Sequence, residues 1–287
     1  MMVAPDDPLL TAPRPRPGGA GRGFWKMSGS GNDFVFLDGR VPGVGAFETP
    51  EAIGRLCSRT EGVGADGVVV IGQHPVEPFS IRYFNRDGSR GELCGNASLC
   101  SSMLAVMLGL ADPAAFRFCT DVGTIAGRIV GNEAELDLPA AQGLQPDADI
   151  LAEPGERRIG FVDTGVPHLV VLTDDANSID LMRRGAALRR HKSLTAGANV
   201  NFISPAGARW RMRTYERGVE GETLACGTGA AASAIVLEAW GLAKPPVELL
   251  TTSGKLLTVS VTHDDKAIHP SLRGEGRLVY AGELVEF

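Results

Sequence analysis

The chain has 287 residues, of which 44% are hydrophobic and 22% are charged, and its formal net charge is -6. These values are typical of a soluble globular protein with one large domain or two ordinary ones, and they exclude a disordered chain. The sequence contains no basic stripe, so we expect no nucleic-acid partner. No apolar run is long enough to span a bilayer, so we expect no membrane partner either.

Residues 1–23 are rich in proline, glycine and arginine and lack the apolar core of a secretion signal. We predict a flexible tail there and a cytoplasmic protein. The chain has five cysteines, an odd number, which is a poor match to a disulfide framework and favours free thiols. There is no CxxC pair and the histidines are scattered singly, so zinc-ligand spacing is absent.

Short runs of β character, separated by turn residues, recur along the chain and predict a strand-rich protein. These runs are residues 34–38 (FVFLD), 68–71 (VVVI), 79–84 (FSIRYF), 168–172 (HLVVL), 209–215 (RWRMRTY) and 256–261 (LLTVSV).

Two segments, residues 97–110 and 230–240, are predicted helices that are apolar nearly all round, the second with Gly241 as its C-cap. A helix without a polar face must be buried on every side. In a strand-rich chain, the way to bury such a helix is to wrap a sheet around it.

A matching signature precedes each predicted helix: CGNA from Cys94 and CGTG from Cys226, and the two cysteines lie 132 positions apart. The repetition predicts two equivalent halves, each a sheet around one central helix with a cysteine at its N-terminus.

A thiol at a helix N-terminus feels the positive end of the helix dipole and nearby backbone N–H donors, which lower its pKa and favour the thiolate. The same donors bind anions. Two such ends facing each other could hold one carboxylate, with one thiolate removing the α-proton and the opposite thiol returning a proton to the other face. We interpret Cys57, Cys100 and Cys119 as ordinary structural cysteines.

Seven segments match the motif set of the diaminopimelate epimerase family, in the family's order. They are GSGNDFVFLD from Gly29, GVGADG from Gly62, YFNRDGS from Tyr83, ELCGN from Glu92, DTGVPH from Asp163, NVNF from Asn199 and YERGVEGETLACGTGAAA from Tyr215. The chain therefore resembles that family from about Phe24 to its C-terminus.

The resemblance implies that Cys94 and Cys226 are the catalytic base/acid pair. It implies that Asn96, with the backbone amides of Gly95, Gly227 and Thr228, holds the reacting α-carboxylate of the substrate. Asn32 would lie beside that carboxylate.

The resemblance also implies a binding site for the far end of a diamino-diacid. Asn85, Asn199 and Arg217 would fix the distal carboxylate, for which arginine and asparagine are good planar partners. Glu216 would accept hydrogen bonds from the distal ammonium group, and with His168 it would shape the electric field around the thiols.

The fold implied by the resemblance is α/β (α+β). It has two similar domains, each a curved, mostly antiparallel sheet around a central helix, with the active site in the cleft between them. The first domain would span residues 24–138, with residues 275–287 returning to it, and the second would span residues 139–274. The implied activity interconverts LL- and meso-2,6-diaminopimelate, a precursor of lysine and peptidoglycan, without metal, pyridoxal phosphate or nucleotide. A homodimer is expected.

GVGADG at residues 62–67 also fits the dinucleotide-binding pattern GxGxxG. A dinucleotide loop follows a strand and opens a helix, whereas here the predicted strand comes after the glycines. We therefore reject a nucleotide site and expect Asp66 to cap or turn the chain.

Two alternatives stay open. Val166, Leu99 and Gly67 depart from common family forms, and Val166 removes a possible polar contact to the distal carboxylate, so a racemase of another amino acid is one alternative. A thiol redox or ligand-binding protein with a switchable disulfide is the other. Such a protein would not exchange a substrate α-proton with solvent.

Overall fold

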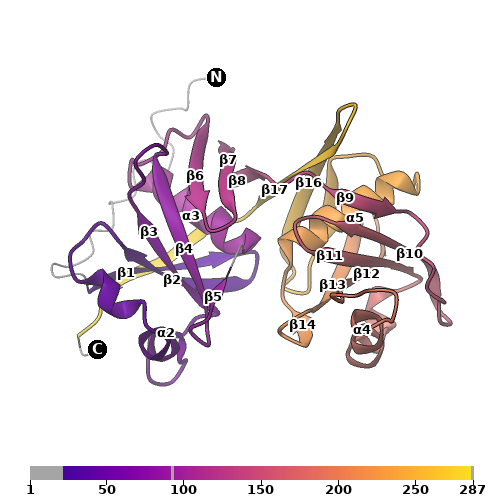
Figure 1. The fold of residues 1–287 in the computed structure, drawn as a ribbon, viewed down its shortest axis with the longest axis horizontal. Coiled ribbons are helices and arrows are strands. Elements are labelled where there is room, and N and C mark those ends of the chain that lie inside the picture. The colour runs from indigo at the N-terminus through magenta and orange to yellow at the C-terminus, as the bar shows by residue number, and fades with distance from the viewer. Residues whose placement is uncertain (1–21, 92–93, 286–287) are drawn as a thin grey trace. The chain divides into compact units, whose positions relative to one another are not determined.

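A computed structural model of the chain describes residues 22–91 and 94–285. The chain divides into two compact units, and we describe each by itself (Figure 1). Unit 1 comprises Met1–Leu136 and Glu275–Phe287, and unit 2 comprises Asp137–Gly274. Of the tail predicted at residues 1–23, all but the last two residues lie outside the described residues, and Gly23 begins the first strand.

Unit 1 is built mainly from strands. Its elements are β1 (Gly23–Gly29), β2 (Asn32–Asp38), the 3-10 helix η1 (Val44–Phe47), α2 (Pro50–Cys57), β3 (Gly67–Gly72), β4 (Phe79–Asn85), β5 (Arg90–Gly91), α3 (Gly95–Met107), β6 (Phe116–Thr120), β7 (Gly123–Val130), β8 (Glu133–Asp137) and β18 (Arg277–Glu283).

Unit 2 repeats nearly the same succession of elements. They are β9 (Gln142–Gln145), β10 (Glu156–Asp163), β11 (Pro167–Thr173), the 3-10 helix η2 (Ala176–Ser178), α4 (Leu181–Arg189), β12 (Asn199–Ala206), β13 (Arg209–Glu216), β14 (Gly221–Thr223), α5 (Gly227–Ala239), β15 (Val247–Leu250), β16 (Leu256–His263) and β17 (Ile268–Gly274).

The two units share one strand topology. In unit 1 the sheet runs β18-β1-β2-β3-β4-β6-β7-β8, antiparallel except for the parallel pairs β2–β3 and β4–β6. In unit 2 it runs β9-β10-β11-β12-β13-β15-β16-β17, again antiparallel except for β11–β12 and β13–β15. The prediction of two similar, mostly antiparallel units is confirmed.

Each unit encloses one buried helix. Helix α3 packs against β1, β3, β4, β7 and β18, and α5 packs against β10, β11, β12, β16 and β17. Both helices have apolar residues on all sides, so burial in the sheet is what stabilises them. None of the helices within the described ranges has the length and apolar character needed to cross a membrane.

The helix boundaries differ somewhat from the prediction. The helices begin at Gly95 and Gly227, directly after the cysteines, because Cys94 and Cys226 are themselves the N-cap residues. Each helix ends just before a glycine with positive φ, Gly109 at 70° and Gly241 at 72°, a conformation that glycine adopts without steric cost. Gly241 thus lies one residue beyond the C-cap residue, Trp240.

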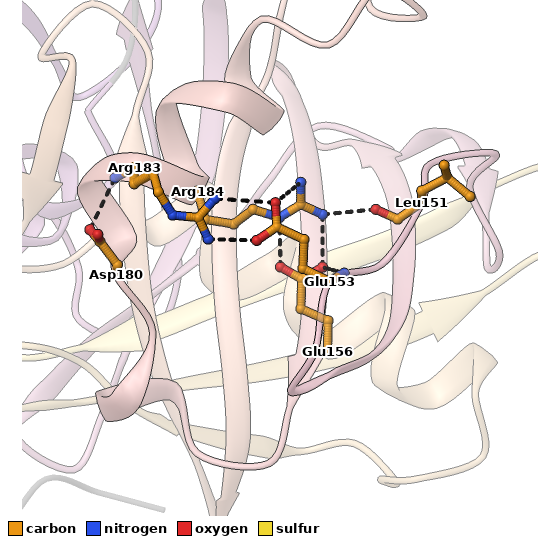
Figure 2. A network of polar contacts seen from close by, with 6 residues as sticks. All are labelled: Leu151, Glu153, Glu156, Asp180, Arg183 and Arg184. Carbon is orange, nitrogen blue, oxygen red and sulfur yellow. Dashed lines mark hydrogen bonds and ion pairs between the residues drawn. The ribbon is translucent and has the colours of Figure 1, made fainter.

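Helix α4 is held to β10 by a buried ion pair (Figure 2). The Arg184 guanidinium donates to both carboxylate oxygens of Glu156, at 2.7 and 2.8 Å, and to the carbonyl oxygen of Leu151. Asp180 caps the helix by accepting from the backbone N–H of Arg183 at 3.1 Å. Because the Arg184 charge is both paired and hydrogen-bonded, its burial is tolerated.

The turn between β1 and β2 lies against the first turn of α3. A Cβ added at Gly29 would lie 2.7 Å from the carbonyl oxygen of Asn96 and 2.8 Å from Cys100 Sγ. Only glycine allows this approach, which places the start of β2 beside the start of α3.

The substitution Gly29→Ala should therefore lower the free energy of unfolding by about 1–3 kcal/mol, the usual cost of overfilling a packed site. Gly54→Ala is the matched control. It lies within α2, where an added Cβ would have no atom within 4 Å, and it should raise stability by about 0.5–1 kcal/mol. Urea denaturation followed by circular dichroism measures both, and equal effects would contradict the close approach at Gly29.

Candidate active site

The two predicted catalytic cysteines occupy equivalent positions in the two units. Cys94 caps α3 with φ -124° and ψ 113°, and Cys226 caps α5 with φ -131° and ψ 111°. The Cys94 carbonyl accepts from Ser98 N and the Cys226 carbonyl from Ala230 N, both at 2.9 Å, which opens each helix. Each thiol therefore lies at the positive end of a buried helix.

In unit 1, three side chains form a polar chain at the start of α3. Asn96 Nδ2 donates to Asn32 Oδ1 at 2.8 Å, and Asn32 Nδ2 donates to Asp66 Oδ2 at 3.1 Å. Because Asp66 is paired with Arg59 and accepts hydrogen bonds here, the direction of each amide in the chain is determined. Two predicted carboxylate-binding residues, Asn32 and Asn96, are thus brought together.

Asp66 lies in a bend directly before β3, as predicted, but its side chain also has a longer-range role. Its carboxylate accepts from the Asn32 side chain and from the backbone N–H of Asp33, at 3.1 and 3.2 Å. Asp66 therefore orients a predicted site residue far away in sequence, which a local turn pattern could not reveal.

Asn85 and Glu216 are equivalent residues, each the last of its strand, β4 or β13. Asn85 opens a turn, in which its amide donates to Ser89 Oγ at 3.0 Å. Burial raises the pKa of Glu216, while a hydrogen bond with Thr223 opposes that rise. The carboxylate of Glu216 is thus held in a poorly solvated place, where a cationic partner would be favoured.

Asn199 and Arg217 are joined directly. Asn199 Oδ1 accepts from the backbone N–H of Arg217 at 2.8 Å, and Arg217 Nη1 donates to the Ala196 carbonyl at 3.2 Å. These contacts fix the base of the Arg217 side chain and leave guanidinium donors for an anion.

Around Cys226 the first turn of α5 is tied to a neighbouring loop. Cys226 Sγ lies 3.5 Å from Thr228 Oγ1, and the carbonyl of Thr228 accepts from Thr164 Oγ1 at 3.0 Å. Gly227 follows the cysteine and is buried. The amides predicted to bind the carboxylate are therefore on a constrained turn.

His168, at the start of β11, is fully buried and lies 3.1 Å from Asn201 Nδ2 through its Nδ1 atom. Burial and, to a smaller extent, the positive charge of Arg217 together lower the pKa of His168 from 6.5 to about 3. Asn201 was not singled out from the sequence, where it is the second asparagine of NVNF. Only its pairing in the sheet reveals it.

Two of the remaining cysteines, Cys57 and Cys100, lie in less reactive surroundings. Burial raises the pKa of Cys57 to about 11, and burial also raises that of Cys100. Both thiols are therefore protonated near neutral pH. Among residues 22–91 and 94–285, no group of three or more His, Cys, Asp or Glu side chains could hold a metal ion.

The His168 environment predicts a pH-dependent stability. In the unfolded chain the His168 imidazole binds a proton near pH 6.5, whereas in the folded chain it does so only near pH 3. The contribution of His168 to the free energy of unfolding is therefore fully present above pH 6.5 and is lost as the pH is lowered. By pH 4 the loss should be about 3 kcal/mol. The His168→Gln variant should not show this loss of stability. Urea unfolding from pH 4 to 8 measures both proteins, and parallel curves would contradict the buried neutral histidine.

Comparison with known proteins shows the family. The family model described as diaminopimelate epimerase matches residues 24–138 and 160–279. A diaminopimelate epimerase of Gemmatimonas aurantiaca is 44% identical over 275 residues, which cover 91% of this chain and 98% of that protein. One of Aquifex aeolicus is 39% identical over 275 residues, covering 92% of this chain and 98% of that protein. A phenazine biosynthesis protein of the PhzF family from Bacillus anthracis has the same fold, with a TM-score of 0.73 at 14% identity, covering 93% of this chain and all of that one. The chain belongs to the diaminopimelate epimerase family.

Proposed function

We propose that the protein is a cofactor-independent epimerase in which Cys94 and Cys226 invert one α-carbon of 2,6-diaminopimelate, interconverting the LL and meso forms. The observation that supports it is the duplicated N-cap cysteine, at the same topological position and with nearly the same backbone angles in both units. A two-base inversion needs two acid/base groups, one for each face of the carbon.

The proposed reaction conserves atoms and charge. One cysteine, as thiolate, takes the α-proton and becomes a thiol, leaving the bonding electron pair on the carbon. The other cysteine, as thiol, gives its proton to the opposite face and becomes a thiolate. Exchange of these two protonation states returns the enzyme to its starting form.

The electron pair left on the carbon delocalises into the neighbouring carboxylate, which needs donors at its oxygens. Asn96 and Asn32, ordered by Asp66, and the amides of Gly95, Gly227 and Thr228 at the two helix starts fit this role. Donors fixed before reaction stabilise developing charge without reorganising.

The proposed substrate is a diamino-diacid because of the polar groups further from the cysteines. Arg217 and Asn199 are positioned together, and with Asn85 they would bind the distal carboxylate. Half-buried Glu216 would bind the distal ammonium group. A site of this kind rejects analogues that lack the distal group, because its buried polar atoms would then be unpaired.

The proposal includes the assembly and setting expected from the sequence. The proposed domains are residues 24–138 with 275–287, and residues 139–274, and the reaction requires both thiols to reach one carbon. The enzyme would act as a cytoplasmic homodimer, with reduced thiols, in the synthesis of lysine and peptidoglycan precursors.

The first test is substrate α-proton exchange. Reduced protein incubated with LL-diaminopimelate in D₂O should incorporate α-deuterium and form the meso isomer, both followed by NMR. Cys94→Ala and Cys226→Ala should each lower turnover by a factor of about 100–10,000, the usual contribution of a positioned acid or base.

Cys119→Ala is the control, because it removes a free, half-buried thiol that belongs to β6 and not to an N-cap, and it should retain activity. Exchange with another amino acid but not with diaminopimelate would move the assignment to a different racemase. Absence of exchange with every amino acid tried would refute the proposed activity.

A second test concerns the distal carboxylate. Arg217→Met should raise KM for diaminopimelate about 10- to 100-fold, the loss expected for a charged hydrogen bond of about 1.5–3 kcal/mol. The value of kcat should change less, because this group is remote from the reacting carbon. Arg209→Met is the control, because Arg209 is exposed and begins β13, the strand that Arg217 directly follows. Similar kinetics for the two variants would argue against a distal role for Arg217.

A further inference from the structure

The duplication of the two units is broken at the sheet positions that face the first turn of each helix. In unit 2, His168 pairs with Asn199 at the start of β12, and Asn201 pairs with Thr214. The equivalent positions of unit 1 hold apolar or aromatic residues instead. There, Phe34 pairs with Gly67 at the start of β3, and Val69 pairs with Tyr83.

The Phe34 and Tyr83 rings of unit 1 make an edge contact, with centroids 6.1 Å apart. The matching residues of unit 2 form a buried hydrogen-bonded group. A polar group of this kind is costly in a core unless every member is satisfied, so its presence at one of two equivalent places needs an explanation.

The orientation of the Asn201 amide follows from its neighbours. Asn201 Nδ2 lies 3.1 Å from the carbonyl oxygen of Leu169, which can only accept a hydrogen bond. Thr214 Oγ1 donates to Asn201 Oδ1 at 2.9 Å. The NH₂ group must therefore point toward Leu169, and its second N–H is directed to His168 Nδ1.

The same amide lies against the start of α5. A Cβ added at Gly229 would collide with Asn201 Oδ1 and would lie 3.3 Å from Cys226 Cβ. Asn201 is fully buried, so water does not compete for its donors. The group thus has one arrangement and is adjacent to the turn that carries Cys226.

We infer that Asn201 is a positioning residue that holds His168 as the neutral tautomer with its proton on Nε2. An N–H of Asn201 directed at Nδ1 leaves no place for a proton on that atom, which disfavours both the other tautomer and the imidazolium. Within residues 22–91 and 94–285, no acceptor lies within hydrogen-bonding distance of His168 Nε2. The Nε2–H group of His168 is therefore a buried hydrogen-bond donor with no acceptor among these residues.

This inference rests on the proposed function for its chemical meaning. A histidine with Nδ1 occupied and Nε2 protonated cannot take a proton from the substrate, so the base role is left to the thiols. It can still donate to a thiolate or a carboxylate without adding a full positive charge. Burial and Arg217 also oppose a cationic ring, consistent with the hydrogen-bonded geometry.

The test is the tautomer itself, measured on the full chain labelled with ¹⁵N-histidine under reducing conditions at pH 7. Two-bond ¹H–¹⁵N correlations distinguish Nε2–H from Nδ1–H rings, and the spectrum of His168→Gln assigns the signal. We expect the Nε2–H pattern in the wild-type protein. An Nδ1–H or imidazolium pattern there would overturn the inference, whatever the enzyme's activity proves to be.

Asn201→Asp replaces the donor by an acceptor of the same size and should move the proton to Nδ1 or produce the imidazolium. If that variant does not fold, Asn201→Ala removes the donor to Nδ1 without adding an acceptor and should mix the tautomers, with Thr214→Ser as a control that keeps the Asn201 amide and its hydroxyl partner. An unchanged Nε2–H pattern in folded Asn201→Asp, or in folded Asn201→Ala, would also overturn the inference.

A kinetic measurement distinguishes a positioning role of Asn201 from a purely structural one. Asn201→Asp, if folded, should lower kcat for diaminopimelate about 10- to 100-fold, as is typical when the partner of a functional histidine is removed. KM should change little, because the distal contacts persist. If the tautomer changes in this variant but kcat does not, Asn201 has no role in the mechanism. If the wild-type protein shows the Nε2–H pattern but is inactive, only the proposed function is refuted.

Discussion

Both units depend on enclosing a helix that has no polar face. Such a helix is stable only when strands cover it on every side, and α3 and α5 are covered in this way. Within the helix, backbone groups satisfy each other, but the first turn always supplies N–H groups beyond those bonds. The apolar core therefore leaves one natural place for polar chemistry at each helix start, and the cysteines lie there. The position of the candidate site thus follows from the same constraint as the fold.

Much of the architecture could be predicted from the sequence because its signals are local. Short runs of β character predicted the strands, and all six named runs lie within observed strands. The all-apolar segments predicted the two helices, and the repeated CG signature predicted the equivalence of the halves. The family membership and the isomerase class expected from the motifs are confirmed by the comparisons.

The sequence did not reveal the residues that orient the site. Asp66 contacts Asn32, and Asn201 contacts His168, across sequence separations of 34 and 33 residues. These pairs form because β2 lies beside β3, and β11 beside β12, in parallel register. Two parallel strands need a long connection, so the residues that contact each other across them lie far apart in the sequence and form no short motif. The predicted helix starts, at residues 97 and 230, also lie after the observed starts at Gly95 and Gly227, because glycine is a weak helix former.

The path of the chain through unit 1 bears on how the protein is made. The strand β18 comes from the last residues of the chain and pairs with β1, near its beginning. Just before that strand, an added Cβ at Gly276 would lie 2.8 Å from the carbonyl oxygen of Leu99 in α3. On the ribosome, all of unit 2 is therefore synthesised before the edge strand of unit 1 exists. The half that is translated first is therefore completed only after the other half has been synthesised.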